Sequence, residues 1–176
     1  MYPHSENQSF FNLLTAFRLK LSRVEIALNP EHIISKNDFD YLEKALNDLK
    51  KHRPIQYIIG ETYFFDLKLR LSEHVLIPRP ETEELVSWIL DATEKNAAIK
   101  ILDIGTGSGC IAIALAKNLP NTKVVGLDIS EDALKIATEN SLSNNVKVQF
   151  LKADILNLEN LSQQFDIIVS NPPYIR

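Results

Sequence analysis

The first 60 residues carry apolar side chains at helical spacing. In the segments SFFNLLTAFRLKL, residues 9–21, and NDFDYLEKALNDLKKH, residues 37–52, apolar residues recur every three or four positions. This spacing gathers them on one face of an amphipathic helix. The sequence therefore predicts two helices, with Phe10, Leu13, Leu14 and Phe17 on the apolar face of the first and Phe39, Leu42, Leu46 and Leu49 on that of the second.

After Pro54 the apolar positions change period. In the stretch FFDLKLRLS, residues 64–72, apolar and charged side chains alternate, as they do in a strand with one buried face. The pattern predicts two short strands joined as a β-hairpin. The residues expected on its apolar face are Phe65, Leu67, Leu69 and Leu71.

From Pro80 onward, predicted helices alternate with strands of almost continuous apolar residues, such as IKILDIG, KVVGLDI and FDIIVS. Such strands are typical of a parallel sheet covered on both faces, and right-handed crossovers give it a doubly wound topology. The sequence therefore predicts an α/β fold with three parts: a helical domain at 1–60, a β-hairpin linker at 61–78 and a Rossmann-like domain at 79–176. Trp88, on the first helix of the last part, is expected in the core.

Composition and charge narrow the class of protein. The chain of 176 residues is 45% hydrophobic with a net charge of −4 and one cysteine, which is ordinary for a globular protein. The net negative charge does not indicate the basic surface patch that is typical of nucleic-acid-binding proteins. No apolar stretch reaches the roughly 20 residues that span a bilayer. One cysteine forms no internal disulfide and the histidines lack metal-ligand spacing, so we expect a cytoplasmic protein without a metal.

A glycine-rich loop joins the first strand of the α/β part to its helix. Gly105, Gly107 and Gly109 alternate with other residues in LDIGTGSGC, and glycine lets a chain turn tightly and a ligand approach closely. The spacing G-x-G-x-G differs from the dinucleotide pattern G-x-G-x-x-G, and no phosphate-binding lysine follows it. Asp103, just before the loop, would repel a pyrophosphate and attract an ammonium group. The loop therefore favours a cofactor with an amino-acid end, such as S-adenosylmethionine.

Two further carboxylates end predicted strands. Asp128 ends the second strand about 20 residues later, where a carboxylate can accept both hydroxyls of a ribose. Asp154 ends the third strand, and either binding of the adenine amino group or a cap for the next turn fits it. Ile155 could pack on the adenine face.

The fourth strand runs into Asn171, Pro172, Pro173 and Tyr174. Prolines end a strand and leave their carbonyl oxygens as acceptors, and the asparagine side chain adds another oxygen. Two oxygens aimed at one spot suit a planar NH₂ group, and the tyrosine ring offers it a flat face. Accepting both hydrogens raises the electron density on that nitrogen and aims its lone pair at a sulfonium methyl. The pattern predicts methyl transfer to a planar nitrogen.

Four blocks of sequence together resemble one family. RPIQYIIGETYFF, VLIPRPETEELV, DIGTGSGCIAIALA and FDIIVSNPPYI are similar to the protein-(glutamine-N5) methyltransferases of peptide chain release factors, which are class I S-adenosylmethionine-dependent enzymes. The resemblance implies methyl transfer to the glutamine of a Gly-Gly-Gln loop, and an amino-terminal helical domain that recognises the release factor. Nucleic acid would be met only indirectly, through the ribosome.

The same resemblance implies the site residues. The PRPETE block, residues 78–83, would cover the cofactor, with Arg79 to Glu83 near the methyl donor, although Pro80 and the acidic residues after it also suit the first turn of a helix. The substrate glutamine would be held by Asn171, Pro172, Pro173 and Tyr174, with Asn171, Pro172 and Tyr174 also catalytic. The cofactor would be bound by Asp103, Gly105, Thr106, Gly107, Ser108, Gly109, Asp128, Ile129, Asp154, Ile155 and Asn171.

Members of this family continue past the NPPY block with further strands. We therefore expect a carboxyl-terminally truncated member, whose sheet holds the first four strands and whose strand FDIIVS forms an apolar edge. Two alternatives are open. One is a nucleic-acid methyltransferase that modifies an adenine or guanine nitrogen after extruding the base. The other is a catalytically incompetent remnant.

Overall fold

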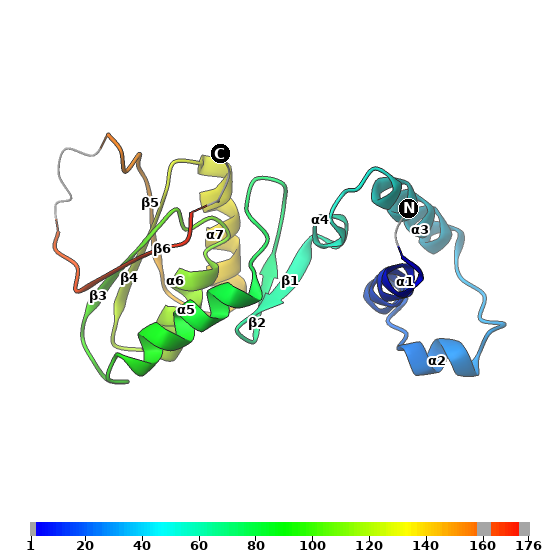
Figure 1. Cartoon of the computed structure of the whole chain (residues 1–176), viewed down its shortest axis with the longest axis horizontal. Helices are drawn as coiled ribbons and strands as arrows, with labels where there is room; N and C mark the ends of the chain where they lie inside the picture. Colours follow the sequence, from blue (N-terminus) through cyan, green and yellow to red (C-terminus); the bar gives the residue numbers. More distant parts are fainter. Residues whose placement is uncertain (1–2, 158–162, 173–176) are drawn as a thin grey trace. The chain divides into compact units, whose positions relative to one another are not determined.

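The computed structural model describes residues 3–157 and 163–172 (Figure 1). The chain divides into two compact units, Met1–Gly60 and Glu61–Arg176, and each is described by itself. In the described part of the chain, no helix has the length and apolarity needed to cross a membrane.

The first unit is helical. Its core is small and is formed by Leu14, Ala45, Leu49 and Ile55. Serine side chains accept hydrogen bonds at the starts of the second and third helices, which replaces partners that the first backbone N–H groups of a helix lack. The helices are α1 (His4–Leu19), α2 (Arg23–Leu28), α3 (Lys36–Lys50) and α4 (Ile55–Ile59).

The predicted apolar faces of α1 and α3 are wrong in part. Leu13, Phe39 and Leu46 are 47%, 55% and 50% exposed. A unit of this size has too little interior to bury a broad stripe on each helix. The buried seam is narrower, and it centres on Leu14 and on the small side chain of Ala45.

The second unit begins with the predicted hairpin, in which β1 (Glu61–Phe64) pairs antiparallel with β2 (Leu67–Arg70). Leu67 and Leu69 are buried as predicted, and Lys68 and Arg70 are exposed. Phe65 is not on the apolar face of a strand. It forms the turn with Asp66, and φ is positive at both residues, as a two-residue hairpin turn of type I′ requires.

The remaining elements form a four-stranded parallel sheet in the order β5-β4-β3-β6. From β3 the chain moves outward through β4 to β5 and then returns to the other side of β3. This reversal confirms the doubly wound α/β prediction, and it places the switch point between β3 and β6. The elements are α5 (Pro80–Asp91), β3 (Lys100–Ile104), α6 (Cys110–Asn118), β4 (Lys123–Asp128), α7 (Glu131–Ser143), β5 (Gln149–Lys152) and β6 (Ile167–Ser170).

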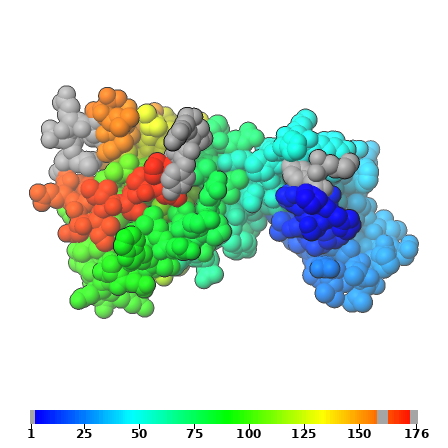
Figure 2. Space-filling model, viewed as in Figure 1, coloured from blue at the N-terminus to red at the C-terminus, as the bar shows by residue number. Residues whose placement is uncertain are grey.

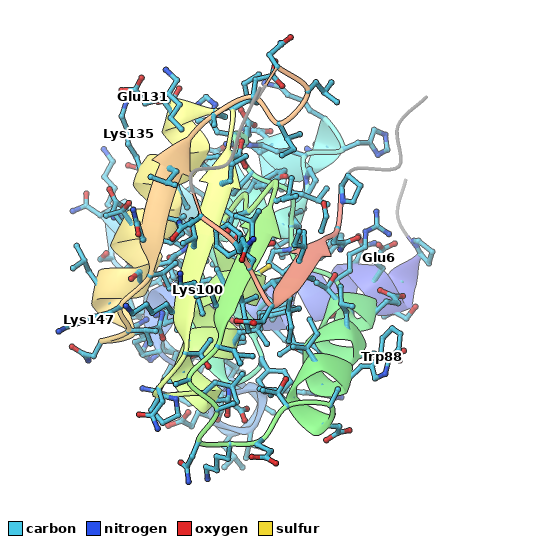
Figure 3. The ribbon with its side chains drawn as sticks, turned by 90° about the vertical axis from the view of Figure 1, so that its left-hand side faces the viewer. Glu6, Trp88, Lys100, Glu131, Lys135 and Lys147 are labelled. Carbon is cyan, nitrogen blue, oxygen red and sulfur yellow. The ribbon has the colours of Figure 1, made fainter. Side chains whose placement is uncertain are left out.

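One face of the sheet is covered by α5, α6 and α7, which lie side by side. Together they bury the main core, which includes Val86, Ile101, Leu115, Val124 and Val169. Trp88 was expected in this core but is 73% exposed, and it points away from the sheet (Figure 3).

The second face carries its own apolar cluster, which includes Leu102, Val125, Leu127 and Phe165 and no helical residue. Within the described residues no helix lies over this face (Figure 3), so the expectation that helices cover both faces is wrong for that part of the chain. The strand β6 lies at the edge of the sheet, as expected. Residues of β6 lie at the molecular surface in the view of Figure 2, and Ile168 is 60% exposed to solvent.

Candidate functional site

The glycine loop lies at the carboxyl end of β3, beside the switch point of the sheet. Gly105, Gly107 and Gly109 have φ values of 70°, 54° and 79°, in the left-handed region that glycine enters at little cost. The N–H groups of Gly105 and Thr106 both donate to the carbonyl oxygen of Leu127, at 2.8 and 2.9 Å. The loop is therefore tied to the end of the neighbouring strand.

The three glycines of the loop serve two purposes. A Cβ atom on Gly105 would have no neighbour within 4 Å, and one on Gly107 would have a single neighbour at 3.9 Å. The space beside these two residues is open to a ligand. A Cβ atom on Gly109 would lie 3.0 Å from Ile113 and 3.1 Å from Ala137, so this glycine allows close packing of α6 on α7.

Asp128 connects the loop to the end of β4. One carboxylate oxygen accepts the N–H of Gly107 at 2.8 Å, and the other accepts the N–H of Ser130 at 2.9 Å. The side chain is half-buried. Because each carboxylate oxygen can accept more than one hydrogen bond, both oxygens keep capacity for hydroxyl groups of a ligand. Asp128 therefore fits the predicted role beside a ribose and also fixes the loop.

Asp103, near the end of β3, is 1% exposed. Its Oδ2 accepts a hydrogen bond of 2.7 Å from the hydroxyl of Thr106, whereas its Oδ1 is buried without a hydrogen-bond partner among the described residues. Burial raises the pKa of Asp103 to about 6, opposed by the Thr106 hydroxyl and assisted by the charge of Asp128. The carboxylate is therefore buried beside Thr106 of the glycine loop, and its contact with an ammonium group stays a prediction.

Asn171 and the PRPETE block share a hollow with the glycine loop. The hollow measures about 40 Å³, whereas ligand pockets usually have roughly 300–1,000 Å³. A cofactor would therefore extend from it across the open carboxyl edge of the sheet. The lining residues are 76–79, Thr82, 105–108, Cys110, Ile111 and Asn171.

Within the PRPETE block three residues line this hollow, namely Pro78, Arg79 and Thr82. Pro80 starts α5, and Glu81 and Glu83 lie in its first turn, where a negative charge stabilises the positive end of the helix dipole. Glu83 also accepts the N–H of Phe65 at 2.8 Å. The block therefore anchors the hairpin turn as well as bordering the site.

Other predicted residues lie apart from this hollow. Asp154 accepts the N–H of Leu156 at 3.0 Å and the side-chain amide of Asn157, which matches the turn-capping alternative. Ile129 and Ile155 are 63% and 39% exposed and project apolar surface beyond the strand ends. Pro172 is exposed. Pro173 and Tyr174 lie outside the described residues.

Sequence reasoning placed Thr82 near the methyl donor as part of the PRPETE block but missed its partner, and it missed Asn140 altogether. Thr82 is 5% exposed, and its hydroxyl accepts a hydrogen bond of 2.8 Å from the side-chain amide of Asn171. Asn140 on α7 is fully buried: its Oδ1 accepts the N–H of Arg70, and its Nδ2 donates to the carbonyls of Arg70 and Ser108. The signal that could have pointed to Asn140 is its place as a polar residue on a helix with enough apolar residues to be partly buried.

The thiol of Cys110 lines the hollow but offers no chemistry at neutral pH. Burial raises its pKa to about 12, and the charge of Asp103 adds to the rise. The thiol therefore stays protonated and is not a nucleophile. In the described part of the chain, no group of three or more His, Cys, Asp or Glu side chains could hold a metal ion.

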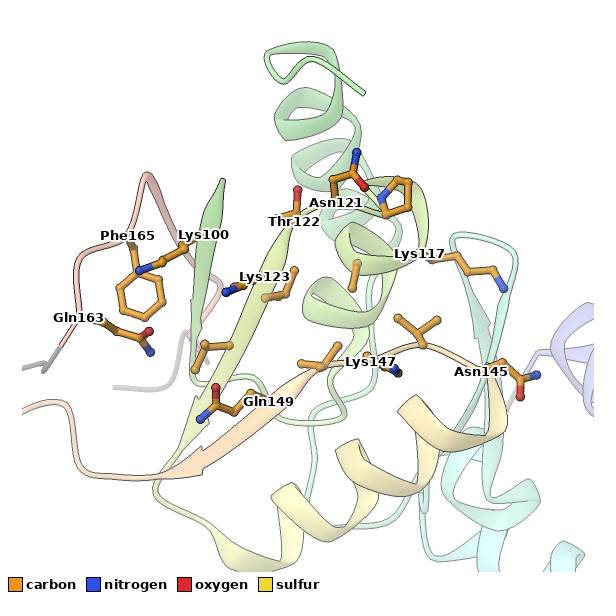
Figure 4. A pocket seen from close by; sticks show the side chains of 16 residues that line it. Lys100, Lys117, Asn121, Thr122, Lys123, Asn145, Lys147, Gln149, Gln163 and Phe165 are labelled. Carbon is orange, nitrogen blue, oxygen red and sulfur yellow. The ribbon is translucent and has the colours of Figure 1, made fainter. Parts of the chain in front are cut away.

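A larger hollow of about 800 Å³ lies at the opposite edge of the sheet, where β3, β4 and β5 begin (Figure 4). Lys100, Lys117, Lys123 and Lys147 line it together with amides and valines. None of the predicted site residues borders it. Ligands of open α/β sheets bind at the carboxyl ends of the strands, so the smaller hollow beside the glycine loop is the candidate site.

Two family models match the chain. A model described as "PrmC N-terminal domain" matches residues 5–60, and one described as "Methyltransferase domain" matches residues 95–174. In the solved structure of a tRNA (uracil-54, C5)-methyltransferase from Pyrococcus abyssi, determined in complex with S-adenosyl-L-homocysteine, the matching part has a TM-score of 0.52 and 25% identity. It covers 64% of this chain and 28% of that one. This likeness agrees with the fold described above.

Curated relatives extend the likeness over nearly the whole chain. A release factor glutamine methyltransferase from Flavobacterium psychrophilum is 48% identical over 100% of this chain and 63% of its own length. Those from Bacteroides thetaiotaomicron and Lactococcus lactis are 42% and 49% identical, over 99% and 81% of this chain and 63% and 52% of their own lengths. The chain thus spans less than two thirds of these relatives. Over nearly its whole length, the chain is similar to the release factor glutamine methyltransferases.

Proposed function

We propose that the protein transfers a methyl group from S-adenosylmethionine to the side-chain amide nitrogen of the glutamine in the Gly-Gly-Gln loop of a peptide chain release factor. The observation that carries the proposal is the position of Asn171. Its carboxamide follows β6 at the switch point and lines the same hollow as the glycine loop. A group that accepts hydrogens from a planar amide therefore lies beside the place where a methyl donor would bind.

In the proposed cofactor site, the chain binds each end of the cofactor with a different group. The negative charge of Asp103, which accepts a hydrogen bond from Thr106 of the hollow, would attract the ammonium group, and the open space beside Gly105 and Gly107 would admit the amino-acid portion. Thr106, Ser108 and Gly109 would complete this loop. Asp128 would accept the ribose hydroxyls, and the adenine would lie near Ile129, Asp154 and Ile155. When bound, the cofactor supplies an electrophilic methyl group on a sulfonium.

In the proposed reaction, the protein orients a poor nucleophile. The lone pair of an amide nitrogen is delocalised, so the Oδ1 atom of Asn171 and the carbonyl of Pro172 would each accept one of its two hydrogens. Both contacts raise the electron density on the nitrogen and point its lone pair at the methyl group. Pro173 and Tyr174 would complete the substrate site. Positioning and preorganised dipoles supply such rate enhancement without a strong base.

The proposal gives each part of the chain its own task. The helical part at 1–60 would recognise the release factor, the hairpin at 61–78 would connect the parts, and residues 79–176 would bind the cofactor. Release factors act on ribosomes, so the proposal places the protein in the cytoplasm, where it meets nucleic acid only through the ribosome.

Two measurements test this function. Titration calorimetry with S-adenosylmethionine should give saturable binding to the chain, weakened at least tenfold in Asp128→Ala. Methyl transfer should then be followed by mass spectrometry on a release factor and on the same factor with its loop glutamine replaced by glutamate. Transfer to the first alone supports the proposal. Transfer to an oligonucleotide but to neither factor would contradict it.

A further inference from the structure

Thr82 is tied to Asn171 by a hydrogen bond that helix capping does not explain. It lies in the first turn of α5, where Arg79 is the N-cap and makes no side-chain cap. Its backbone N–H donates to the carbonyl of Arg79 at 3.0 Å. Its hydroxyl instead accepts the Nδ2 of Asn171 at 2.8 Å, across 89 positions of the sequence. Thr82 is only 5% exposed, and its hydroxyl thus bonds a carboxamide that is distant in the sequence.

The orientation of that carboxamide decides what it can do. An asparagine side chain presents a donor on one side and an acceptor on the other, and a half turn exchanges them. With Nδ2 directed at Thr82, the oxygen is directed away from α5. The opposite orientation would present an NH₂ group to the NH₂ group of a substrate amide, and two donors do not form a hydrogen bond.

We infer that Thr82 is a positioning residue for the methyl transfer, holding the carboxamide of Asn171 so that its oxygen meets the substrate amide. The inference rests on the proposed function, which assigns Asn171 to that amide. Helix α5, which borders the cofactor site, would then also determine which end of the Asn171 carboxamide faces the substrate. In this inference Thr82 acts through Asn171 and is not itself a catalytic residue.

The test compares three variants of the full chain. Thr82→Val keeps the shape of the side chain and removes the acceptor, whereas Thr82→Ser keeps the acceptor. Thr93→Val is the matched control, because Thr93 lies just after the C-cap of the same helix and its hydroxyl donates to the carbonyl of Ile89 at 2.7 Å. We expect Thr82→Val to lower kcat about tenfold or more with unchanged cofactor affinity, and Thr82→Ser and Thr93→Val to stay within about twofold of the parent. Equal kcat in Thr82→Val and the parent would overturn the inference.

A double-mutant cycle separates positioning from general damage. If Thr82 acts through Asn171, Thr82→Val has no further effect in a chain that already carries Asn171→Ala. An equal loss of kcat in both backgrounds would show that Thr82 acts by another route and would refute the inference. Circular dichroism of each variant identifies any that fails to fold, and the serine variant then carries the comparison with the parent.

A second readout is independent of activity. In a ¹⁵N spectrum, the side-chain NH₂ of Asn171 should exchange slowly with water in the parent and in Thr82→Ser, and faster in Thr82→Val. If no methyl transfer is detected with the parent chain, the proposed function fails, but this spectrum still decides whether Thr82 orients Asn171. Equal exchange in the parent and in Thr82→Val would sink the inference even if the enzyme is active.

Discussion

Asp103 should make the stability of the chain depend on pH in a direction opposite to that of most carboxylates. Its pKa is raised from the ordinary 3.8 to about 6 because the group is buried. Between these two pH values the folded chain holds a proton that the unfolded chain has lost. The free energy of unfolding therefore falls as the pH rises through this window. Since one pKa unit corresponds to about 1.4 kcal/mol, the full effect is about 3 kcal/mol, complete above about pH 7.

The substitution Asp103→Asn isolates this effect, because asparagine keeps the shape and an acceptor for Thr106 but does not titrate. Surface carboxylates such as Asp38 and Glu131, whose pKa values are lowered by hydrogen bonds from Ser35 and Lys152, contribute an opposite slope that is the same in both chains. Urea unfolding followed by circular dichroism between pH 4 and 8 gives the difference. We expect the parent to lose about 3 kcal/mol relative to the variant from pH 4 to 7.

The exposed Asp91, at the end of α5, provides the control, because Asp91→Asn makes the same chemical change away from the buried site. A flat difference between the parent and Asp103→Asn from pH 4 to 7 would refute the argument that burial governs Asp103. If the carboxylate binds the ammonium of the cofactor, affinity for S-adenosylmethionine should also fall below about pH 6 in the parent and stay constant in the variant.

Three further substitutions test other parts of the site. Asn140→Leu leaves the N–H and carbonyl of Arg70 without their partner, so urea titration should show a loss of about 3 kcal/mol, and a loss under about 1 kcal/mol would contradict this. Gly126→Ala would place a Cβ atom 2.8 Å from the ring of Phe150. It should lower the free energy of unfolding by about 1–3 kcal/mol, which a lower melting temperature would show. Asn171→Ala should reduce kcat about 10²–10³-fold, or roughly 2.7–4 kcal/mol, and near-normal turnover would remove Asn171 from the mechanism.

The sheet and the glycine loop could be predicted because local sequence determines them. Apolar runs such as KILDI form a strand that is buried on both faces, and glycines at alternate positions match a loop whose φ values are positive at each of them. The strand pattern and the loop conformation depend on neighbours within a few residues. The contact of Asp128 with the loop spans 21 positions, and its role beside a ribose stays a prediction.

The misses arise where a residue's partner is distant in sequence. Leu13, Phe39 and Leu46 have the correct helical spacing, but which stripe is buried depends on the packing of the other helices. Thr82 and Asn140 pair with residues 89 and 70 positions away, and periodicity carries no information on such pairs. Trp88 was expected in the core because it lies on the first helix of the α/β part, yet it is on the side of α5 that faces away from the sheet.

The two halves of the candidate site are supported to different degrees. The glycine loop follows β3, which is paired on both sides, and it is held by hydrogen bonds to Leu127 and Asp128. Asn171 follows β6, which pairs on one side only among the described residues. It depends on the β3 pairing, on the Ser170 hydroxyl bonded to the carbonyl of Ile104, and on Thr82. An unpaired edge opens more readily than a central strand, so the cofactor half is intrinsically the more rigid. The contact with Thr82 therefore matters most where the sheet gives least support.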